Sequence, residues 1–208
     1  TLAAWIYPTA KDGVIVSRAT GSDQGEVGWG LYLEDGKLRF NMSTRVLDDG
    51  VAAETVEDIR LNAWQHVVAT YDGSKTPDGI HVYLDGASQT LTGLNDLVGN
   101  RLRLRWPLRI GASGSDKSRF QGHIDDVRIY AAVLTADEAA VIGTAESLSD
   151  ISDIAADRRS DAQADKMRLA FLDQYAPLEI HEAWRQVIAL ERERKALWDS
   201  FPTVMVME

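Results

Sequence analysis

Two short segments combine aromatic and polar side chains in a way that suits a sugar-binding surface. The first is Trp64–Gly73, WQHVVATYDG, and the second is Ile80–Gly86, IHVYLDG. Both are alternating runs rich in β-branched and aromatic residues. Both also end in Asp-Gly, which is a strong signal for a β-hairpin turn. As antiparallel strands they would place four side chains on one face: Trp64, His66, Tyr83 and Asp85. Aromatic rings can stack on a sugar ring while polar groups hold its hydroxyls, so this face is a candidate glycan site.

The register of this hairpin decides which face is polar. A loop centred near Ser74–Thr76 predicts three apolar pairs: Tyr71 opposite Ile80, Ala69 opposite Val82, and Val67 opposite Leu84. These pairs would form the core side of the hairpin and leave the aromatic and polar residues on the other side. A slip of one residue would exchange the two faces. The alternative interpretation is that Trp64 is simply a core residue.

A second pattern is the alternation RLRLRW at residues 101–106. As a strand it would line up Arg101, Arg103 and Arg105 on one face. Guanidinium groups bind sulfate and carboxylate groups in a bidentate manner, so this row is a candidate site for an anionic glycan. Alternatively, the arginines keep an edge strand soluble or pair with acidic residues of the same domain.

Asp125 and Asp126 are the carboxylates to consider for calcium, which takes oxygen ligands. Ile124 and Val127 have opposite parity in this strand, so a β-bulge is expected between them if both are buried. The favoured interpretation is that Asp125 holds backbone amides at the bulge. Calcium remains an alternative, with its ligands unassigned.

No catalytic constellation is predicted. A retaining glycosidase needs two closely spaced carboxylates, and the acids of 54–58 have the wrong spacing for one strand face. His181-Glu182 lacks the second His of a zinc-protease motif, because residue 185 is Arg. The 208 residues include no cysteine, which excludes thiolate catalysis and disulfides. We therefore expect a protein that is not an enzyme.

Composition narrows the partners. A net charge of −10 argues against nucleic-acid binding, which depends on neutralising phosphates. No apolar run approaches the ~20 residues that a membrane helix needs, so no membrane span is expected. The chain begins within a strand-like segment, without Met or a signal peptide. We expect it to be a fragment of a longer protein.

Short strands must position all of these residues. Alternating segments separated by Gly- and Asp-containing turns predict strands at 2–7, 14–17, 28–33, 37–42, 64–71, 80–84, 87–91, 108–111 and 120–130, with a weaker one within 51–59. Many strands at hairpin spacing indicate an antiparallel β-sandwich. Thr135–Glu138 is a capping box that opens a short helix through about Ile142.

Several segments resemble laminin-G-like domains of the concanavalin-A-like lectin and glucanase jelly rolls. They include LAAWIYP, WGLYL, WxHVxxTYD, VYLDG, LRIG and FxGxIDDVRIY, in the order of that family, and they cover about Thr1–Gly143. The resemblance implies a mainly β jelly roll over residues 1–146. It also implies that the strand that usually comes first in the family is missing here. The Leu2–Tyr7 strand is then expected to have an open edge.

Residues 147–208 have a different hydrophobic periodicity. Apolar residues at three- and four-residue steps predict two helices broken at Pro177, which we interpret as a helical hairpin. The tail Thr203–Met207 is apolar and β-prone, and we expect it to pair as an added strand with the open edge or with a neighbouring chain. The whole arrangement resembles the middle of large modular secreted planctomycete proteins.

These features favour a non-catalytic module that binds carbohydrate or glycoconjugate, within a larger extracytoplasmic protein. The expected partners are a polysaccharide or glycoprotein and other domains of the same polypeptide. The alternative is a structural spacer or protein–protein interaction module without a glycan ligand. The family resemblance supports both, since a fold does not determine its function.

Overall fold

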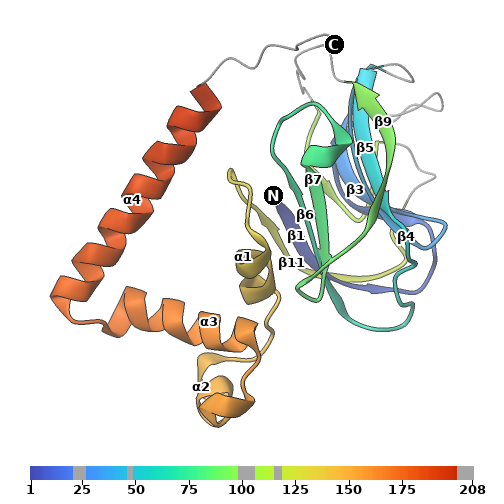
Figure 1. Ribbon diagram of the computed structural model, residues 1–208. Coiled ribbons are helices and arrows are strands. Elements are labelled where there is room, and N and C mark those ends of the chain that lie inside the picture. The colour runs from blue at the N-terminus through green and yellow to red at the C-terminus, as the bar shows by residue number, and fades with distance from the viewer. Residues whose placement is uncertain (21–26, 46–48, 98–105, 115–118, 201–208) are drawn as a thin grey trace. The chain divides into compact units, whose positions relative to one another are not determined.

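The computed structural model describes residues 1–20, 27–45, 49–97, 106–114 and 119–200. The chain divides into two compact units, residues 1–145 and residues 146–208. The first unit is a sandwich of two antiparallel sheets (Figure 1). The predicted mainly β antiparallel sandwich followed by helices is confirmed, whereas the pairing of two of these helices as a hairpin stays a prediction.

One sheet has five strands in the order β11-β1-β6-β7-β8. Their bounds are β1 Leu2–Pro8, β6 Gln65–Tyr71, β7 Ile80–Leu84, β8 Ala87–Ser88 and β11 Gly122–Ile129. The other has six strands in the order β10-β2-β3-β4-β5-β9. Their bounds are β2 Gly13–Ala19, β3 Gly28–Glu34, β4 Lys37–Arg45, β5 Asp49–Thr55, β9 Leu91–Leu97 and β10 Arg109–Ile110.

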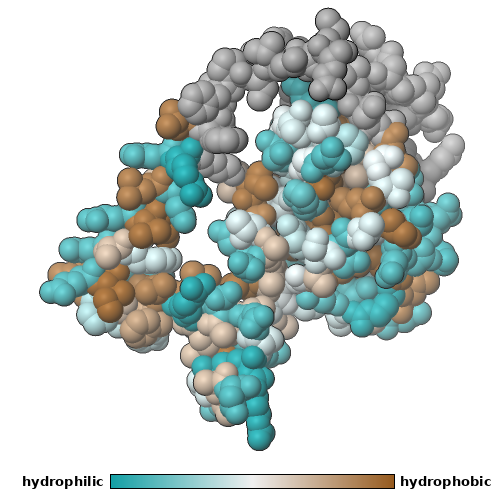
Figure 2. Space-filling view, viewed as in Figure 1, coloured by the Kyte–Doolittle hydropathy of each residue, from teal (hydrophilic) through white to brown (hydrophobic). Residues whose placement is uncertain are grey.

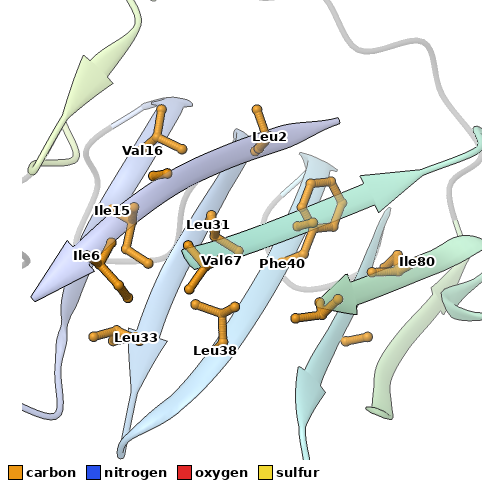
Figure 3. Close-up of a cluster of buried hydrophobic side chains, with 14 of the residues drawn as sticks. Leu2, Ile6, Ile15, Val16, Leu31, Leu33, Leu38, Phe40, Val67 and Ile80 are labelled. Atoms are coloured by element: carbon orange, nitrogen blue, oxygen red, sulfur yellow. The ribbon is translucent and has the colours of Figure 1, made fainter. Parts of the chain in front are cut away.

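The core lies between the two sheets and consists of alternate aliphatic side chains from each. Figure 3 shows side chains of both sheets pointing into this layer, among them Leu2, Ile6, Leu31, Leu38 and Val67. Strand side chains alternate between the two faces, so every second residue is left on the outside. The outward residues of the five-stranded sheet are the ones that bear on function.

The central hairpin has the predicted register. Tyr71 pairs with Ile80, Ala69 with Val82, and Val67 with Leu84. The members of these pairs belong to the core or pack against it. The two segments chosen from their alternation and Asp-Gly endings are therefore adjacent strands, β6 and β7, with the apolar face inward.

The first strand does not have an open edge, so that prediction is wrong. β1 lies between β6 on one side and β11 on the other. Its ladder with β11 runs from Leu2 opposite Ile129 to Pro8 opposite Gly122. The Tyr130 N–H also donates to the Thr1 carbonyl, at 2.9 Å. The strand-addition prediction for Thr203–Met207 concerns residues outside those that the structure describes.

The predicted β-bulge in β11 is confirmed. The β1–β11 register shifts between Ala3 and Trp5, and Asp126 opposite this point has a left-handed φ of 48°. The bulge lets Ile124 and Val127 both pack against the core although their parity differs. The carboxylate of Asp125 accepts the Asp126 N–H at 2.8 Å, which stabilises the turn.

Helix α1 (Ala136–Ile142) begins at the predicted capping box. The Thr135 hydroxyl accepts the Glu138 N–H, and the Glu138 carboxylate accepts the Thr135 N–H. Buried Ala139 of α1 packs with Ala3, Val68 and Tyr83, the outward residues of three neighbouring strands. The helix therefore covers part of the outer face of the five-stranded sheet.

The second unit is helical. It contains α2 (Leu148–Ser152), α3 (Asp161–Ala170), a π-helical turn η3 (Phe171–Tyr175) and α4 (Leu178–Ser200). The two predicted helices are confirmed, whereas α2 was missed although Ser147 and Asp150 form a capping box there. Arg159 donates to the carbonyls of Ile151, Ser152 and Ile154, which ties α2 to the chain before α3. None of the described helices meets the length and apolarity that a membrane crossing requires.

The close approach of β1 and β11 at Gly122 gives a stability prediction. Gly122 has φ 130°, and a Cβ there would stand 2.0 Å from the Tyr7 carbonyl oxygen. We expect Gly122→Ala to lower the free energy of unfolding by at least about 2 kcal/mol, because the ladder must move apart. Chemical denaturation of purified protein measures this change.

Gly73→Ala is the matched control for this substitution. Gly73 also has a left-handed φ, 85°, but a Cβ there would meet nothing within 4 Å. It should therefore cost only about 1 kcal/mol from the backbone conformation. Equal losses for the two variants would show that the ladder does not depend on Gly122.

Candidate functional site

Three rings gather on the outer face of the five-stranded sheet, and we call them the aromatic cluster: Tyr7, Trp64 and His123. The ring centroids of Tyr7 lie 5.8 Å from those of Trp64 and His123, and Trp64 and His123 are 6.2 Å apart. Trp64 is 46% exposed, and His123 is also exposed. Tyr7 is half-buried. The two exposed rings are a surface on which an apolar ring face can stack.

The strand pairing explains why these residues meet. Tyr7 of β1 and His123 of β11 are direct cross-strand partners. Trp64 immediately precedes β6, whose first residue Gln65 pairs with Ile6 on the other edge of β1. Since Ile6 points into the core, its neighbour Tyr7 points outward. Three strands thus bring together residues that are far apart in the sequence.

Asp125 places a carboxylate on the same face. It follows His123 by two residues in β11 and pairs with Trp5, which precedes Tyr7 by two residues in β1. Residues two apart in a strand share a face, so Asp125 and Trp5 continue the outward row of the cluster. The structure therefore joins Trp64 and Asp125, which the sequence analysis assigned to separate candidate sites.

His66 and Tyr83 do not belong to an open surface, and this part of the predicted glycan face is wrong. Their exposed fractions are 1% and 6%. Tyr83 packs against buried residues that include Ala139 of α1. The ring centroids of His66 and Trp5 are 5.2 Å apart. A Cβ at Gly143, the residue that caps α1, would stand 2.8 Å from His66 Nδ1. The hairpin face was predicted correctly and so was helix α1, but the packing of α1 over part of this face was not.

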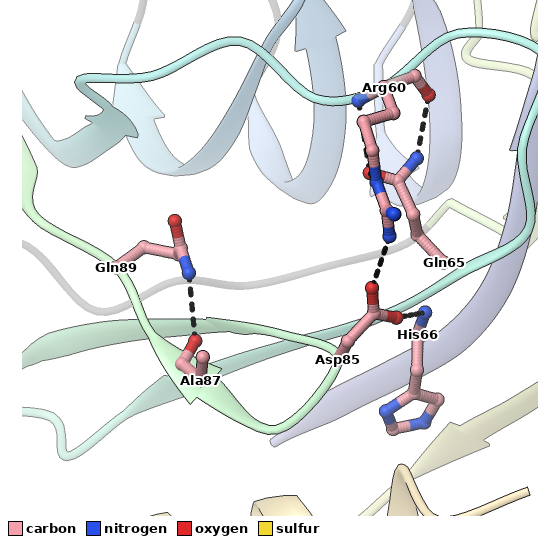
Figure 4. A network of polar contacts seen from close by, with 6 residues as sticks. All are labelled: Arg60, Gln65, His66, Asp85, Ala87 and Gln89. Carbon is pink, nitrogen blue, oxygen red and sulfur yellow. Dashed lines mark hydrogen bonds and ion pairs between the residues drawn. The ribbon is translucent and has the colours of Figure 1, made fainter.

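Asp85 holds the hairpin together. One of its carboxylate oxygens accepts the His66 N–H at 2.8 Å, and the other accepts the Arg60 guanidinium at 2.5 Å (Figure 4). Gln65 in turn bonds both the N–H and the carbonyl of Arg60. Asp85 itself has φ 49° at the turn. Through these contacts Asp85 fixes the β7–β8 turn against β6.

His66 is neutral at physiological pH. Burial lowers its pKa to about 4, and the positive charge of Arg128 acts in the same direction. Its Nδ1 atom has no hydrogen-bond partner among the residues that the structure describes. A buried imidazole without a nearby compensating acceptor is costly to charge.

Asp126 is occupied by an ion pair. Arg128 binds its two carboxylate oxygens, with Nε at 2.8 Å and a terminal nitrogen at 2.5 Å, and this hydrogen bonding holds the pKa of Asp126 below its usual value. No group of three or more His, Asp or Glu side chains gathers as a metal site in the described part of the chain. Calcium at Asp125 and Asp126 stays a prediction. Arg101, Arg103 and Arg105 lie outside the described residues.

Two other features of the sandwich are weaker candidates for a ligand site. On the six-stranded sheet, Arg39 pairs with both Glu34 and Glu54, so these charges compensate one another. A cleft of about 770 Å³ is lined by residues of β5, β7 and β9 and of the segment before β7. Its lining contains no Trp, Tyr or Phe among the described residues: Ala53, Thr76, Pro77, Asp78, Ile80, His81, Gln89, Leu91, Gly93 and Leu94.

Sequence reasoning missed Tyr7 and His123. The alternation of β1 indicated that Trp5 and Tyr7 share a face, but it did not indicate which strands lie beside them. The signal that could have found the cluster is the pairing of β1 with β11, which joins residues more than a hundred positions apart.

Residues 1–140 match the family model of the concanavalin A-like lectin/glucanases superfamily. Among curated proteins, an adhesion G-protein coupled receptor V1 of Danio rerio is 30% identical over 142 residues. The match covers 64% of this chain and 2% of the receptor, so the chain corresponds to a very small part of that protein.

Solved structures share the sandwich. The CBM40 module of the Ruminococcus gnavus IT-sialidase, bound to α2,3-sialyllactose, matches with a TM-score of 0.55 and 14% identity, over 69% of this chain and 81% of that one. An SAP-like pentraxin from Limulus polyphemus matches with a TM-score of 0.49 and 19% identity, over 69% and 68%. At 14% identity the likeness to the CBM40 module concerns the fold alone.

The buried His66 gives a pH prediction. Its pKa in the folded protein, about 4, lies below the ordinary 6.5, so His66 takes up a proton on unfolding between these pH values. Stability should be fully present above pH 6.5 and should fall as the pH drops towards 4, by up to about 3 kcal/mol. Denaturation curves of the wild type and of His66→Gln across this range test it.

The test compares the acid-dependent loss of stability of the wild type with that of His66→Gln, because other groups titrate as well. Burial raises the pKa of Glu34, for example, which changes stability in the opposite direction. His66→Gln should have a smaller acid-dependent loss than the wild type, whereas substituting the exposed His81 by Gln should leave the loss unchanged. Parallel curves for all three proteins would contradict the assignment.

Proposed function

Because the chain belongs to the concanavalin A-like lectin/glucanases superfamily, we propose that its sandwich binds a carbohydrate and does not transform it. The observation that supports this proposal is the aromatic cluster of Tyr7, Trp64 and His123, in which the rings of Trp64 and His123 are exposed. The fold match to a module solved with sialyllactose is consistent with it. The geometry of the cluster supplies the mechanism.

Stacking is the main interaction in this mechanism. The C–H face of a pyranose lies against the exposed Trp64 ring, where it removes apolar surface of both partners from water. Tyr7 and His123 extend the platform on one side and offer polar atoms to hydroxyl groups. The Trp64 and His123 side chains are already exposed, so this part of the surface is preformed.

Charge selects the class of sugar. Asp125 continues the outward row beside the cluster, and the chain has a net charge of −10. A carboxylate accepts hydrogen bonds from sugar hydroxyls but repels a sugar carboxylate or sulfate. The cluster therefore suits a neutral hexose. Binding of anionic polysaccharide through Arg101, Arg103 and Arg105 is a separate proposal, which requires binding to weaken as salt rises.

The comparisons also support a proposal for the biological setting. We propose an extracytoplasmic module of a larger protein, with a polysaccharide or glycoprotein as partner. The similarity to a segment of an adhesion receptor supports this setting. A spacer or protein-interaction module without a glycan ligand is the alternative, and the exposed apolar side chains of the second unit favour it.

Trp64→Ala tests the binding surface. We expect at least a tenfold loss of affinity for the best neutral ligand found on a glycan array, because about 1.4 kcal/mol of stacking is removed. Isothermal titration calorimetry measures the loss. Trp106→Ala is the matched control, since Trp106 is 45% exposed but belongs to the segment before β10 in the other sheet. An equal loss in both variants, or no glycan bound at all, would contradict the proposal.

Calcium support is tested on the same array. If Asp125 and Asp126 help to hold the ion, binding should fall in a chelator and return with added calcium. Asp125→Asn should then reduce the calcium response. Binding that is identical with chelator and with calcium would leave the aromatic cluster as the proposed site and would remove calcium from the proposal.

A further inference from the structure

Helix α4 carries an exposed stripe that differs from the rest of its surface. The stripe repeats at alternating steps of three and four residues: Ile180, Ala183, Val187, Leu190, Arg194 and Leu197. The exposed fractions of its large aliphatic members are 47% for Ile180, 51% for Val187, 63% for Leu190 and 60% for Leu197. Figure 2 shows hydrophobic side chains reaching the surface along α4.

Three residues next to the stripe are less exposed than its members. His181, Trp184 and Ile188 are half-buried and lie beside the stripe on the helix surface. The stripe itself occupies an arc of about 100° on an ideal helix, which is the width of a packed seam. A repeat of steps of three and four is the pattern by which two helices pack as a coiled coil. Exposed aliphatic rows of this kind mark interaction surfaces.

We propose that this stripe pairs with the same stripe of a second copy of the chain, with the two helices antiparallel. The stripe is complementary to itself in that direction. Ile180 of one copy then lies against Leu197 of the other, Val187 against Leu190, and Ala183 against Arg194. The smallest residue of the seam thus faces the largest, and the aliphatic residues face one another.

The charge of Arg194 selects the direction. In a parallel pair Arg194 would face Arg194 across the seam, and two like charges would be held together. In the antiparallel pair it faces Ala183, whose neighbours four residues before and three residues after are Glu179 and Gln186. Both are exposed and carry oxygen acceptors within reach of a guanidinium group.

The contact spans the helix from Ile180 to Leu197, which is about 26 Å or five turns. A single pair of helices of this length buries less area than a standard permanent interface. The dimer should therefore dissociate on dilution. The proposed dimer does not depend on glycan binding. It would present two sandwiches together and so raise the avidity for a repetitive ligand.

Sedimentation equilibrium of the 208-residue chain tests the association. We expect a reversible dimer, and we expect Leu190→Glu to weaken it at least tenfold by placing a charge in the seam. Leu178→Glu is the matched control, because Leu178 is 69% exposed on the same helix but lies outside the stripe. Far-ultraviolet circular dichroism checks that α4 still forms. A chain that stays monomeric, or equal weakening by both variants, would overturn the proposal.

Cross-linking tests the direction. The chain has no cysteine, so Ile180→Cys and Leu197→Cys each introduce a unique thiol. When the two variants are mixed under mild oxidation, the antiparallel pair predicts mixed disulfides in large excess over either homodimeric disulfide. Predominance of the homodimeric disulfides would establish the parallel pair and overturn the proposal.

A charge exchange completes the test. Arg194→Glu should weaken the dimer, because the introduced carboxylate of one copy would then lie near the Glu179 carboxylate of the other. Adding Glu179→Arg in the same chain should restore dimerisation. Failure of the double variant to recover, with α4 intact, would show that Arg194 does not lie against Ala183 of a second copy.

Discussion

The position of β1 between β6 and β11 is the constraint on which the rest of the first unit depends. Both edges of β1 are hydrogen-bonded, so its backbone groups are satisfied and the strand serves as a template on each side. The inward residues Leu2, Ala4 and Ile6 complete the core, while Trp5 and Tyr7 face outward. The same ladders that stabilise the sandwich therefore assemble the aromatic cluster.

The outer face of the five-stranded sheet is divided by helix α1. Where the helix lies, Val68 and Tyr83 are buried and His66 is held neutral. Beyond the helix, Trp64 remains open to solvent. Covering part of the face contributes hydrophobic stabilisation at the expense of binding surface, and the uncovered part keeps the aromatic side chains that a ligand can reach. The residues that α1 buries and those of the proposed binding surface are therefore different residues of one sheet.

The two units solve the problem of apolar surface in different ways. The sandwich encloses its aliphatic residues between two layers, whereas α4 leaves Ile180, Val187 and Leu190 exposed. A single helix cannot bury its own stripe, so such residues are stabilised only by a second surface. For this reason the proposed dimer contact lies in the helical unit and the proposed glycan site in the sandwich.

The sequence by itself determined the local structure of this protein. Alternation and Asp-Gly turns predicted the β6–β7 hairpin in its correct register, and Thr135 with Glu138 predicted the start of α1. The parity of Ile124 and Val127 predicted the bulge. Each of these signals works between residues a few positions apart or across one short turn, where the intervening chain has few conformations.

Only the tertiary structure decided which residues form the surface. The pairing of β1 with β11 connects segments more than a hundred residues apart, and the outward alternation of β1 is compatible with any neighbour. It was this pairing that removed the expected open edge and placed His123 beside Tyr7 and Asp125 beside Trp5. The burial of His66 and Tyr83 likewise depends on where α1 lies, which its capping box does not specify. Long-range contacts are set by packing of the whole core, so no local pattern encodes them.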